Sequence, residues 1–96
     1  MKILILVDCQ NDFITGSLRN EDAIKAVPNI VNKIKTNEYD QIFVTRDTHK
    51  DDYLDTKEGE KLPVVHCIKD TEGWQIEPSI LEAIKDRKFH YIDKPT

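Results

Sequence analysis

Five side chains of this sequence have the types and spacing that a metal site or an acid–base site requires: Asp8, Asp47, His49, His66 and Lys94. Asp47 and His49 are two residues apart, so in extended backbone both side chains point to the same side. With His66 they offer two imidazoles and one carboxylate, which can bind a divalent ion such as zinc and leave positions open for water or substrate. The alternative is that Asp47 caps a turn and both histidines are exposed in a polar loop.

Asp8 directly follows an apolar run at residues 3–7. A run without polar residues predicts a strand covered on both faces, as in a parallel sheet, and strand tips are where open α/β sheets place their chemistry. A lysine such as Lys94 beside Asp8 could hold the carboxylate ionised and donate to a developing anion. Alternatively, Asp8 belongs to a turn held by Asx-type bonds, and Lys94 is an ordinary solvated lysine.

The two thiols are predicted to pack rather than to react. Cys9 follows Asp8 in extended backbone and should point away from the face that Asp8 uses, while Cys67 lies in an apolar stretch. Phe13 and Trp74 are candidates for the walls of a substrate pocket. The alternative is that both are core residues, as aromatic side chains beside apolar runs more often are.

Two amphipathic helices are predicted between the strands. Apolar residues at helical spacing predict one from about Val27 to Lys35, with Pro28 in its first turn, where a missing backbone N–H is tolerated. The second is predicted at residues 79–85, and it follows Pro78 in the same way.

Two more strands are predicted, at residues 41–45 and 89–92, from their β-branched and aromatic content. The charged segment 50–61 is predicted to be a long surface loop, in which Tyr53 is a packing residue. Residues 62–68 contain a proline that would remove a ladder hydrogen bond, so an irregular extended segment is expected there.

The order strand–helix–strand–loop–helix–strand predicts an α/β fold with a parallel sheet and right-handed crossovers. All three strand tips then lie at one edge of the sheet. Topology alone therefore brings together Asp8, Asp47 with His49, and Lys94. This convergence is the argument for a functional site.

Length and composition limit the possible classes of function. The 96 residues allow one compact domain, and 39% hydrophobic and 33% charged residues with a formal net charge of −4 leave no basic footprint for nucleic acid. The first apolar run is too short for a signal peptide, and nothing approaches a membrane span. Two cysteines without a CxxC pair favour a reducing cytoplasm.

Several motifs stand in a characteristic order along the chain. They are Val-Asp-Cys-Gln-Asn-Asp-Phe at 7–13, Gly-Ser-Leu at 16–18, Val-Thr-Arg-Asp-Thr-His at 44–49, and Leu-Pro-Val-Val-His-Cys-Ile at 62–68 with Thr-Glu-Gly-Trp at 71–74. In this combination the sequence resembles the isochorismatase-like cysteine hydrolases, the superfamily that includes the nicotinamidases. The resemblance covers the whole chain and implies a three-layer, doubly wound, Rossmann-like parallel sheet, of which about half is present.

The resemblance implies an Asp-Lys-Cys triad in which Asp8 matches the aspartate and Lys94 the lysine. In this family the aspartate accepts the thiol proton, the lysine supports the charged pair, and the thiolate attacks a small amide to give an acyl-enzyme that water hydrolyses. The metal-using members bind a divalent ion through a set that Asp47, His49 and His66 match in identity and spacing.

Two departures from the family pattern limit this prediction. The family's nucleophile lies well downstream of the lysine, and neither Cys9 nor Cys67 matches its position. Residues 1–96 are therefore expected to be the N-terminal portion of a single hydrolase domain, catalytically incomplete by themselves. Nicotinamidases also commonly carry a tryptophan three residues before the last metal histidine, where this chain has Pro63. The identity of the amide substrate is therefore left open.

A half-domain would leave the first strand, central in the full fold, as an exposed apolar edge. We therefore expect a complementing C-terminal half or self-association into a homo-oligomer. Two other functions remain open. One is a non-catalytic metal-binding or assembly module, and the other is a binding domain with a flavodoxin-like sheet and no metal, which leaves the strand-tip motifs without a role.

Overall fold

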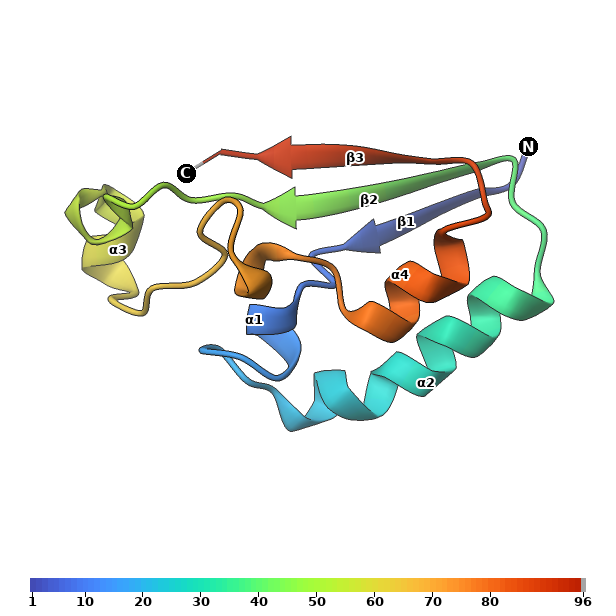
Figure 1. Ribbon diagram of the computed structural model, residues 1–96, viewed down its shortest axis with the longest axis horizontal. Helices are drawn as coiled ribbons and strands as arrows, with labels where there is room; N and C mark the ends of the chain where they lie inside the picture. Colours follow the sequence, from blue (N-terminus) through green and yellow to red (C-terminus); the bar gives the residue numbers. More distant parts are fainter. Residues whose placement is uncertain (96) are drawn as a thin grey trace.

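The computed structural model describes residues 1–95, which form a parallel sheet packed against helices (Figure 1). The strands, in the spatial order β1-β2-β3, are β1 (Ile3–Val7), β2 (Gln41–Asp47) and β3 (Phe89–Lys94). The helices are α1 (Asn11–Ile14), α2 (Glu21–Thr36), α3 (Lys57–Lys61) and α4 (Pro78–Ile84), with 3₁₀-helices η1 (Tyr53–Asp55) and η2 (Glu72–Trp74). The predicted α/β class, parallel pairing and order of the main elements are confirmed.

The register of the sheet brings the polar strand ends to one edge. Val7 pairs with Thr45, and Asp47 pairs with Lys94. Strand β2 thus extends to Asp47, two residues beyond the predicted end. Because all three strands are parallel, their arrowheads in Figure 1 point the same way, toward the loops around α3.

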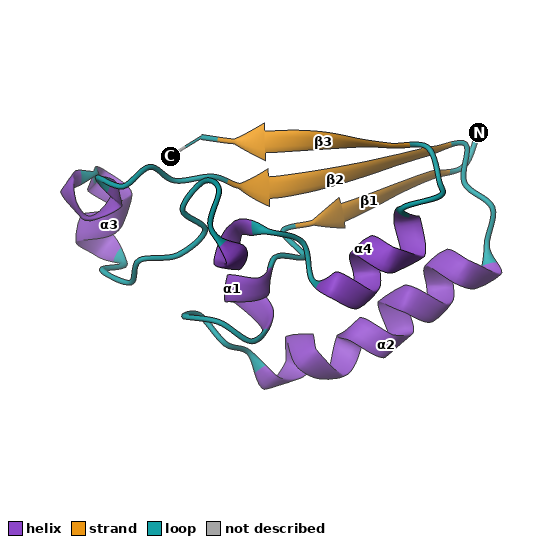
Figure 2. Ribbon diagram, in the orientation of Figure 1, coloured by secondary structure: helices purple, strands orange, loops and turns teal. Residues whose placement is uncertain are grey.

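The helices cover one face of the sheet (Figure 2). Helices α2 and α4 pack on that face, where Leu6, Ile42 and Val44 of the strands are buried. The buried core residues from both layers are Leu6, Ile34, Ile42, Val44, Ile76, Ile80 and Ile84. On the opposite face, which we call the open face, β1 presents Ile3, Ile5 and Val7.

The prediction that the first strand is covered on both faces is not met within residues 1–95. Ile3, Ile5 and Val7 remain 49%, 58% and 62% exposed. The reason is topological. The chain steps from β1 to β2 to β3 in one direction, and two right-handed crossovers in the same direction place their helices on the same face. Strand β1 is also an edge of this sheet, as expected for a half-domain.

Helix α2 begins earlier than predicted. It covers Glu21–Thr36 instead of starting near Val27, and Pro28 lies inside it rather than in its first turn. Asn20 fixes the start, because its side chain accepts hydrogen bonds from the backbone N–H groups of the second and third helical residues. Pro28 is exposed, so water can reach the carbonyl that loses its helical partner there.

The charged segment at 50–61 is more ordered than the predicted surface loop, because η1 and α3 both form within it. Tyr53 is 0% exposed, and its hydroxyl donates a hydrogen bond to the carbonyl of Leu62 at 2.8 Å. The prediction that Tyr53 is a packing residue is confirmed. This buried ring is the anchor that folds an otherwise polar segment back onto the molecule.

The remaining element predictions agree with the structure in type, although β3 runs to Lys94, two residues beyond its predicted end. Helix α4 covers Pro78–Ile84, within a residue of the predicted bounds, and Glu77 caps its N-terminus. Residues 62–68 form no strand and approach the sheet region through a parallel bridge between His49 and Ile68. Within residues 1–95, no helix is both long enough and apolar enough to cross a membrane.

Candidate functional site

Asp8 and Lys94 form an ion pair across the carboxyl edge of the sheet. Lys94 Nζ donates to Asp8 Oδ2 at 2.7 Å, and the hydroxyl of Thr45 donates to Asp8 Oδ1 at 2.9 Å. Strand β2 separates β1 from β3, so the pair spans the middle strand. The hydrogen bond to Asp8 raises the pKa of Lys94, so the lysine stays an ammonium at neutral pH.

The backbone of Asp8 aims its carboxylate at this pair. In a regular strand Asp8 would point to the face opposite Val7. Its φ of 52° lies in the left-handed region and interrupts that alternation. The carboxylate instead meets Thr45, which is the sheet partner of Val7, and the backbone N–H of Asp8 also donates to the Thr45 hydroxyl at 3.1 Å.

The other predicted residues gather around Asp47 Oδ2. His49 Nε2 lies 3.0 Å and His66 Nε2 lies 3.7 Å from this oxygen. The imidazoles are 0% and 2% exposed, so the alternative of two exposed loop histidines is wrong. His66 Nδ1 donates to the carbonyl of Val64 at 2.6 Å, which leaves Nε2 as the nitrogen with a free electron pair for a metal.

Glu58 is a fourth donor that the sequence analysis missed. One ligand atom from each of four residues lies within 4.8 Å of the others, and these residues are Asp47, His49, Glu58 and His66. Glu58 comes from α3, in a charged segment where no pattern distinguishes it from its acidic neighbours. No local sequence pattern could have found it, because the contact that holds this segment beside the histidines is long-range: the ring of Tyr53 lies 4.5 Å from that of His49.

This donor set suits a divalent ion of the zinc type. Imidazole nitrogens and carboxylate oxygens are both zinc ligands, and three or four of them are the usual number. The two imidazoles and Asp47 are buried or half-buried, which makes a compensating cation favourable next to the carboxylate. In the register of the sheet, Asp47 is opposite Lys94, so the donor set adjoins the acid–lysine pair.

Residues 2–94 match the isochorismatase domain family. The chain belongs to the isochorismatase family. The resemblance inferred from the motifs is therefore confirmed, and so is the fold that it implies, because solved structures of related proteins superpose over almost the whole chain.

Nicotinamidases and pyrazinamidases are among the similar proteins. The nicotinamidase of Saccharomyces cerevisiae is 29% identical over 98% of this chain and 56% of the relative. The crystal structure of the yeast nicotinamidase bound to the inhibitor nicotinaldehyde has a TM-score of 0.81 at 27% identity, over 99% of this chain and 57% of that one. The pyrazinamidase of Pyrococcus horikoshii in complex with zinc has a TM-score of 0.72 at 27% identity, over 98% and 51%. The chain spans about half the length of these relatives.

Neither thiol of this isochorismatase-family chain is prepared for nucleophilic attack. Burial, with nearby carboxylates adding to it, raises the pKa of Cys9 to about 11 and that of Cys67 to about 12. At neutral pH almost no thiolate is present at either position. Cys9 packs against the core and Cys67 is 0% exposed, as the sequence predicted.

The two aromatic candidates lie in different surroundings. Phe13 stands edge-on to His66, with ring centroids 5.5 Å apart, so it borders the donor set. Trp74 is 6% exposed, stacks on the guanidinium of Arg46 at 3.9 Å, and donates its indole N–H to Thr48. The surroundings of Trp74 are those of a packing residue, which was the alternative reading of its sequence context.

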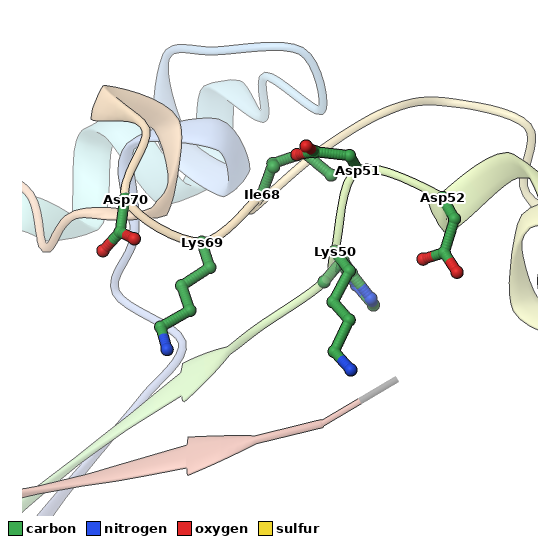
Figure 3. A pocket seen from close by; sticks show the side chains of 7 residues that line it. Lys50, Asp51, Asp52, Ile68, Lys69 and Asp70 are labelled. Carbon is green, nitrogen blue, oxygen red and sulfur yellow. The ribbon is translucent and has the colours of Figure 1, made fainter.

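A hollow of about 490 Å³ opens beside His49. Figure 3 shows its labelled lining residues on the two segments that run from Lys50 to Asp52 and from Ile68 to Asp70. Its lining comes from the segments that follow His49 and His66. The lining residues are His49, Lys50, Asp51, Asp52, Ile68, Lys69 and Asp70. Two lysines face three aspartates there, so the hollow has no dominant charge, and we assign no ligand to it.

Proposed function

We propose that this chain is the N-terminal portion of a single isochorismatase-type domain that hydrolyses a small amide through a cysteine nucleophile outside residues 1–96. The observation that carries the proposal is the 2.7 Å ion pair between Asp8 and Lys94 beside a metal donor set whose two histidines are buried. Membership of a family with amidase relatives supports it. The high pKa values of Cys9 and Cys67 argue that neither is the nucleophile.

In the proposed reaction Asp8 accepts the proton of the incoming thiol, and Lys94 stabilises the charges that form. The thiolate bonds to the amide carbonyl carbon, and the carbon–nitrogen bond breaks as Asp8 returns the proton to the leaving amine. Water then attacks the acyl-enzyme with the same carboxylate as base, which releases the acid and restores the thiol. Lys94 begins the reaction as an ammonium, because the hydrogen bond to Asp8 raises its pKa.

We further propose a divalent metal site, with zinc as the expected ion, formed by Asp47, His49 and His66 with Glu58 as a fourth donor. A bound ion would supply Lewis-acid polarisation of a substrate atom. Phe13, edge-on to His66, is the candidate wall for an apolar part of the substrate. The nature of that part is open, since Pro63 stands where nicotinamidases commonly have tryptophan.

A zinc titration tests the metal site. We expect the purified chain to bind about one zinc per chain, and we expect His49→Ala and His66→Ala each to weaken binding by at least tenfold, because each removes a buried ligand. His90→Ala is the matched control, since His90 is the third histidine and lies on β3 outside the donor set. Equal affinity in all three variants would remove the metal proposal.

An ammonia-release assay with small amides, nicotinamide among them, tests the hydrolase proposal. We expect no release from the chain alone. Release is expected when it is combined with a polypeptide, encoded downstream of the codon for Thr96, that carries a cysteine after an apolar strand. In that combination Asp8→Asn and Lys94→Met should lower kcat by about 10²-fold or more, because each removes a group that handles the proton or its charge. Release by the chain alone that Asp8→Asn does not change would contradict the proposal.

The second candidate function is a non-catalytic metal-binding or assembly module. It is favoured by one observation: the metal donor set is assembled within the described residues, whereas both thiols have raised pKa values. A genome with no suitable downstream cysteine, together with tight zinc binding, would select this function. In either case we propose that the partner is a complementing half or a second copy of the chain. We also propose a reducing cytoplasm as location, since the described cysteines are both free thiols.

A further inference from the structure

Gln10 is the most deeply buried polar side chain next to the donor set that has no role in the proposed chemistry. It is 0% exposed, although it lies in the connection between β1 and α1. Its carboxamide contacts the backbone of Asp47 and that of Trp74. We propose that Gln10 is a positioning residue that fixes Asp47 as a metal ligand, an assignment that rests on the metal site proposed above.

The carboxamide of Gln10 takes the place of a missing strand. Regular pairing of β1 with β2 ends at Val7 and Thr45, so Asp47 has no strand residue beside it on the β1 side. Gln10 Oε1 accepts the Asp47 N–H at 2.8 Å, and Gln10 Nε2 donates to the Asp47 carbonyl at 2.9 Å. One side chain therefore makes both hydrogen bonds that a neighbouring strand would make.

The orientation of this carboxamide is determined by its partners. Nε2 makes a second hydrogen bond, to the carbonyl of Trp74 at 2.8 Å. Two carbonyls on one side require the NH₂ group there, and the Asp47 N–H on the other side requires the oxygen. Glutamate at position 10 would turn a carboxylate oxygen toward two carbonyl oxygens. Even this isosteric replacement should therefore lose the hydrogen bonds that hold the Asp47 backbone.

The hydrogen bonds from Gln10 matter for the metal because they complete the pairing of Asp47, whose backbone is then held on both sides. On the β3 side it pairs with Lys94, and the next backbone N–H, that of Thr48, donates to the Lys94 carbonyl at 2.8 Å. With the backbone fixed, only the side-chain torsions of Asp47 remain free to place Oδ2 against the two imidazoles. Residues that orient metal ligands in this way typically change metal affinity 10- to 100-fold when they are replaced.

The same connection also reaches the other metal-ligating loop. Asp12 Oδ2 accepts the backbone N–H of Cys67 at 2.8 Å, directly after His66. Cys67 has a φ of 49°, a left-handed conformation in which a non-glycine residue needs such support. Gln10 and Asp12 thus connect one short segment to the backbones of both loops, which supports positioning rather than simple space filling as the role of Gln10.

The test compares Gln10→Glu and Gln10→Met with the wild type and with Asn11→Asp. Asn11→Asp is the matched control for charge, because Asn11 is the next residue and its amide donates to the exposed carbonyl of Glu72. Gln10→Met keeps the volume without charge. Zinc affinity is measured by competition with a chromophoric chelator, and Co²⁺ absorption reports the ligand geometry, both on chains with wild-type far-ultraviolet circular dichroism.

We expect zinc binding 10- to 100-fold weaker and altered Co²⁺ bands in both Gln10 variants, and neither change in Asn11→Asp. Weaker zinc binding in Gln10→Glu could not be an effect of the added negative charge, because that charge by itself would attract the ion. In the metal-free chain, hydrogen exchange of the Asp47 amide should become at least tenfold faster in Gln10→Met, with the Thr45 amide unchanged.

Three results would overturn the assignment, and they are distinguishable. If the wild type binds zinc and the Gln10 variants bind it equally well with unchanged Co²⁺ bands, Gln10 has no positioning role and the metal site stands. If the Asp47 amide exchanges hydrogen at the same rate in Gln10→Met as in the wild type, Gln10 does not hold the Asp47 backbone. If the wild type binds no zinc, the proposed metal site fails and the assignment fails with it.

Discussion

Asp8 has a backbone conformation that costs about 1–3 kcal/mol for a residue other than glycine. Its immediate surroundings offset this cost. Thr45 and Lys94 together give its carboxylate two hydrogen bonds, and its backbone N–H is also bonded to Thr45. The strain delivers the carboxylate to the face where Lys94 lies. At residue scale, the site therefore depends on Thr45 as well as on the charged pair.

Cys9 should behave as an unreactive thiol. Its pKa is raised to about 11 from 9.0, so the folded chain holds a proton that the unfolded chain releases above pH 9. The stability that this contributes is complete below pH 9 and is lost as the pH rises through about 11. We expect the unfolding free energy to fall more steeply over this window in the wild type than in Cys9→Ala, as measured by urea unfolding at several pH values.

Alkylation gives an independent measurement of the same pKa. Peptide mapping after iodoacetamide treatment separates Cys9 from Cys67, and modification of Cys9 in the folded chain should reach half its maximal rate near pH 11. Cys9 in a urea-unfolded sample is the control and should titrate near its ordinary value. Rapid modification of folded Cys9 at pH 8 would contradict the burial argument.

Several site residues could be predicted from their types and positions, and others could not. Asp8, Asp47, His49 and Lys94 lie at strand ends or within two residues of them, and a parallel topology brings these ends to one edge. Glu58 could not be found this way, because it sits among other acids and reaches the donor set only through the fold of α3.

At element scale, Arg46 connects the ends of β2 and β3 to η2. Its guanidinium lies between the rings of Trp74 and Tyr91, at 3.9 and 3.8 Å, and makes two hydrogen bonds with the Asp93 carboxylate, at 2.7 and 3.0 Å. Its flat, delocalised cation suits both stacking and bidentate pairing. Because Asp47 and Lys94 come directly after Arg46 and Asp93, this contact sets the spacing of the site-bearing strand ends.

Arg46→Lys should therefore destabilise the fold although it keeps the charge. We expect a loss of about 1–3 kcal/mol of unfolding free energy in urea, because an ammonium cannot stack between two rings or pair with both carboxylate oxygens. Arg19→Lys is the matched control: the Arg19–Glu21 pair is 57% and 69% exposed, so the same replacement should have an effect near zero. Equal effects at both positions would show that the stacked arrangement contributes nothing to stability.

The element boundaries show where local patterns stop being informative. The strands and α4 are predictable because apolar composition or a proline marks them. Helix α2 starts at Glu21 because the side chain of Asn20 caps it, and the proline at 28 wrongly suggested a later start. The order within 50–61 depends on a long-range contact, the burial of Tyr53 against the histidines, which no local pattern contains.

At the scale of the whole molecule, the exposed apolar residues of the open face favour association with a partner. Ile3, Ile5 and Val7 line one edge of this face, and Ile92 of β3, 47% exposed, lies on it opposite Thr45. An apolar face beside an unpaired strand edge favours association. The relatives are nearly twice as long, and the two helices of the described residues that pack on the sheet, α2 and α4, both lie on the other face.

We therefore expect the isolated chain to self-associate through the open face. Ile5→Glu should increase the monomer fraction in gel filtration and light scattering, because it places a charge at the centre of the apolar edge, where Ile5 is 58% exposed and contributes little to the core. The melting temperature of the monomer should change little for the same reason.

Leu54→Glu is the matched control, because Leu54 is 51% exposed in η1, away from the sheet. If association depends on the open face, Leu54→Glu leaves the oligomer intact while Ile5→Glu disperses it, and the difference should persist in high salt, where simple charge repulsion is screened. A wild-type chain that elutes as a stable monomer at micromolar concentration would show that the open face tolerates water. The exposed edge would then no longer be a reason to expect a partner, and the case for a complementing half would depend only on the proposal that the nucleophile lies outside residues 1–96.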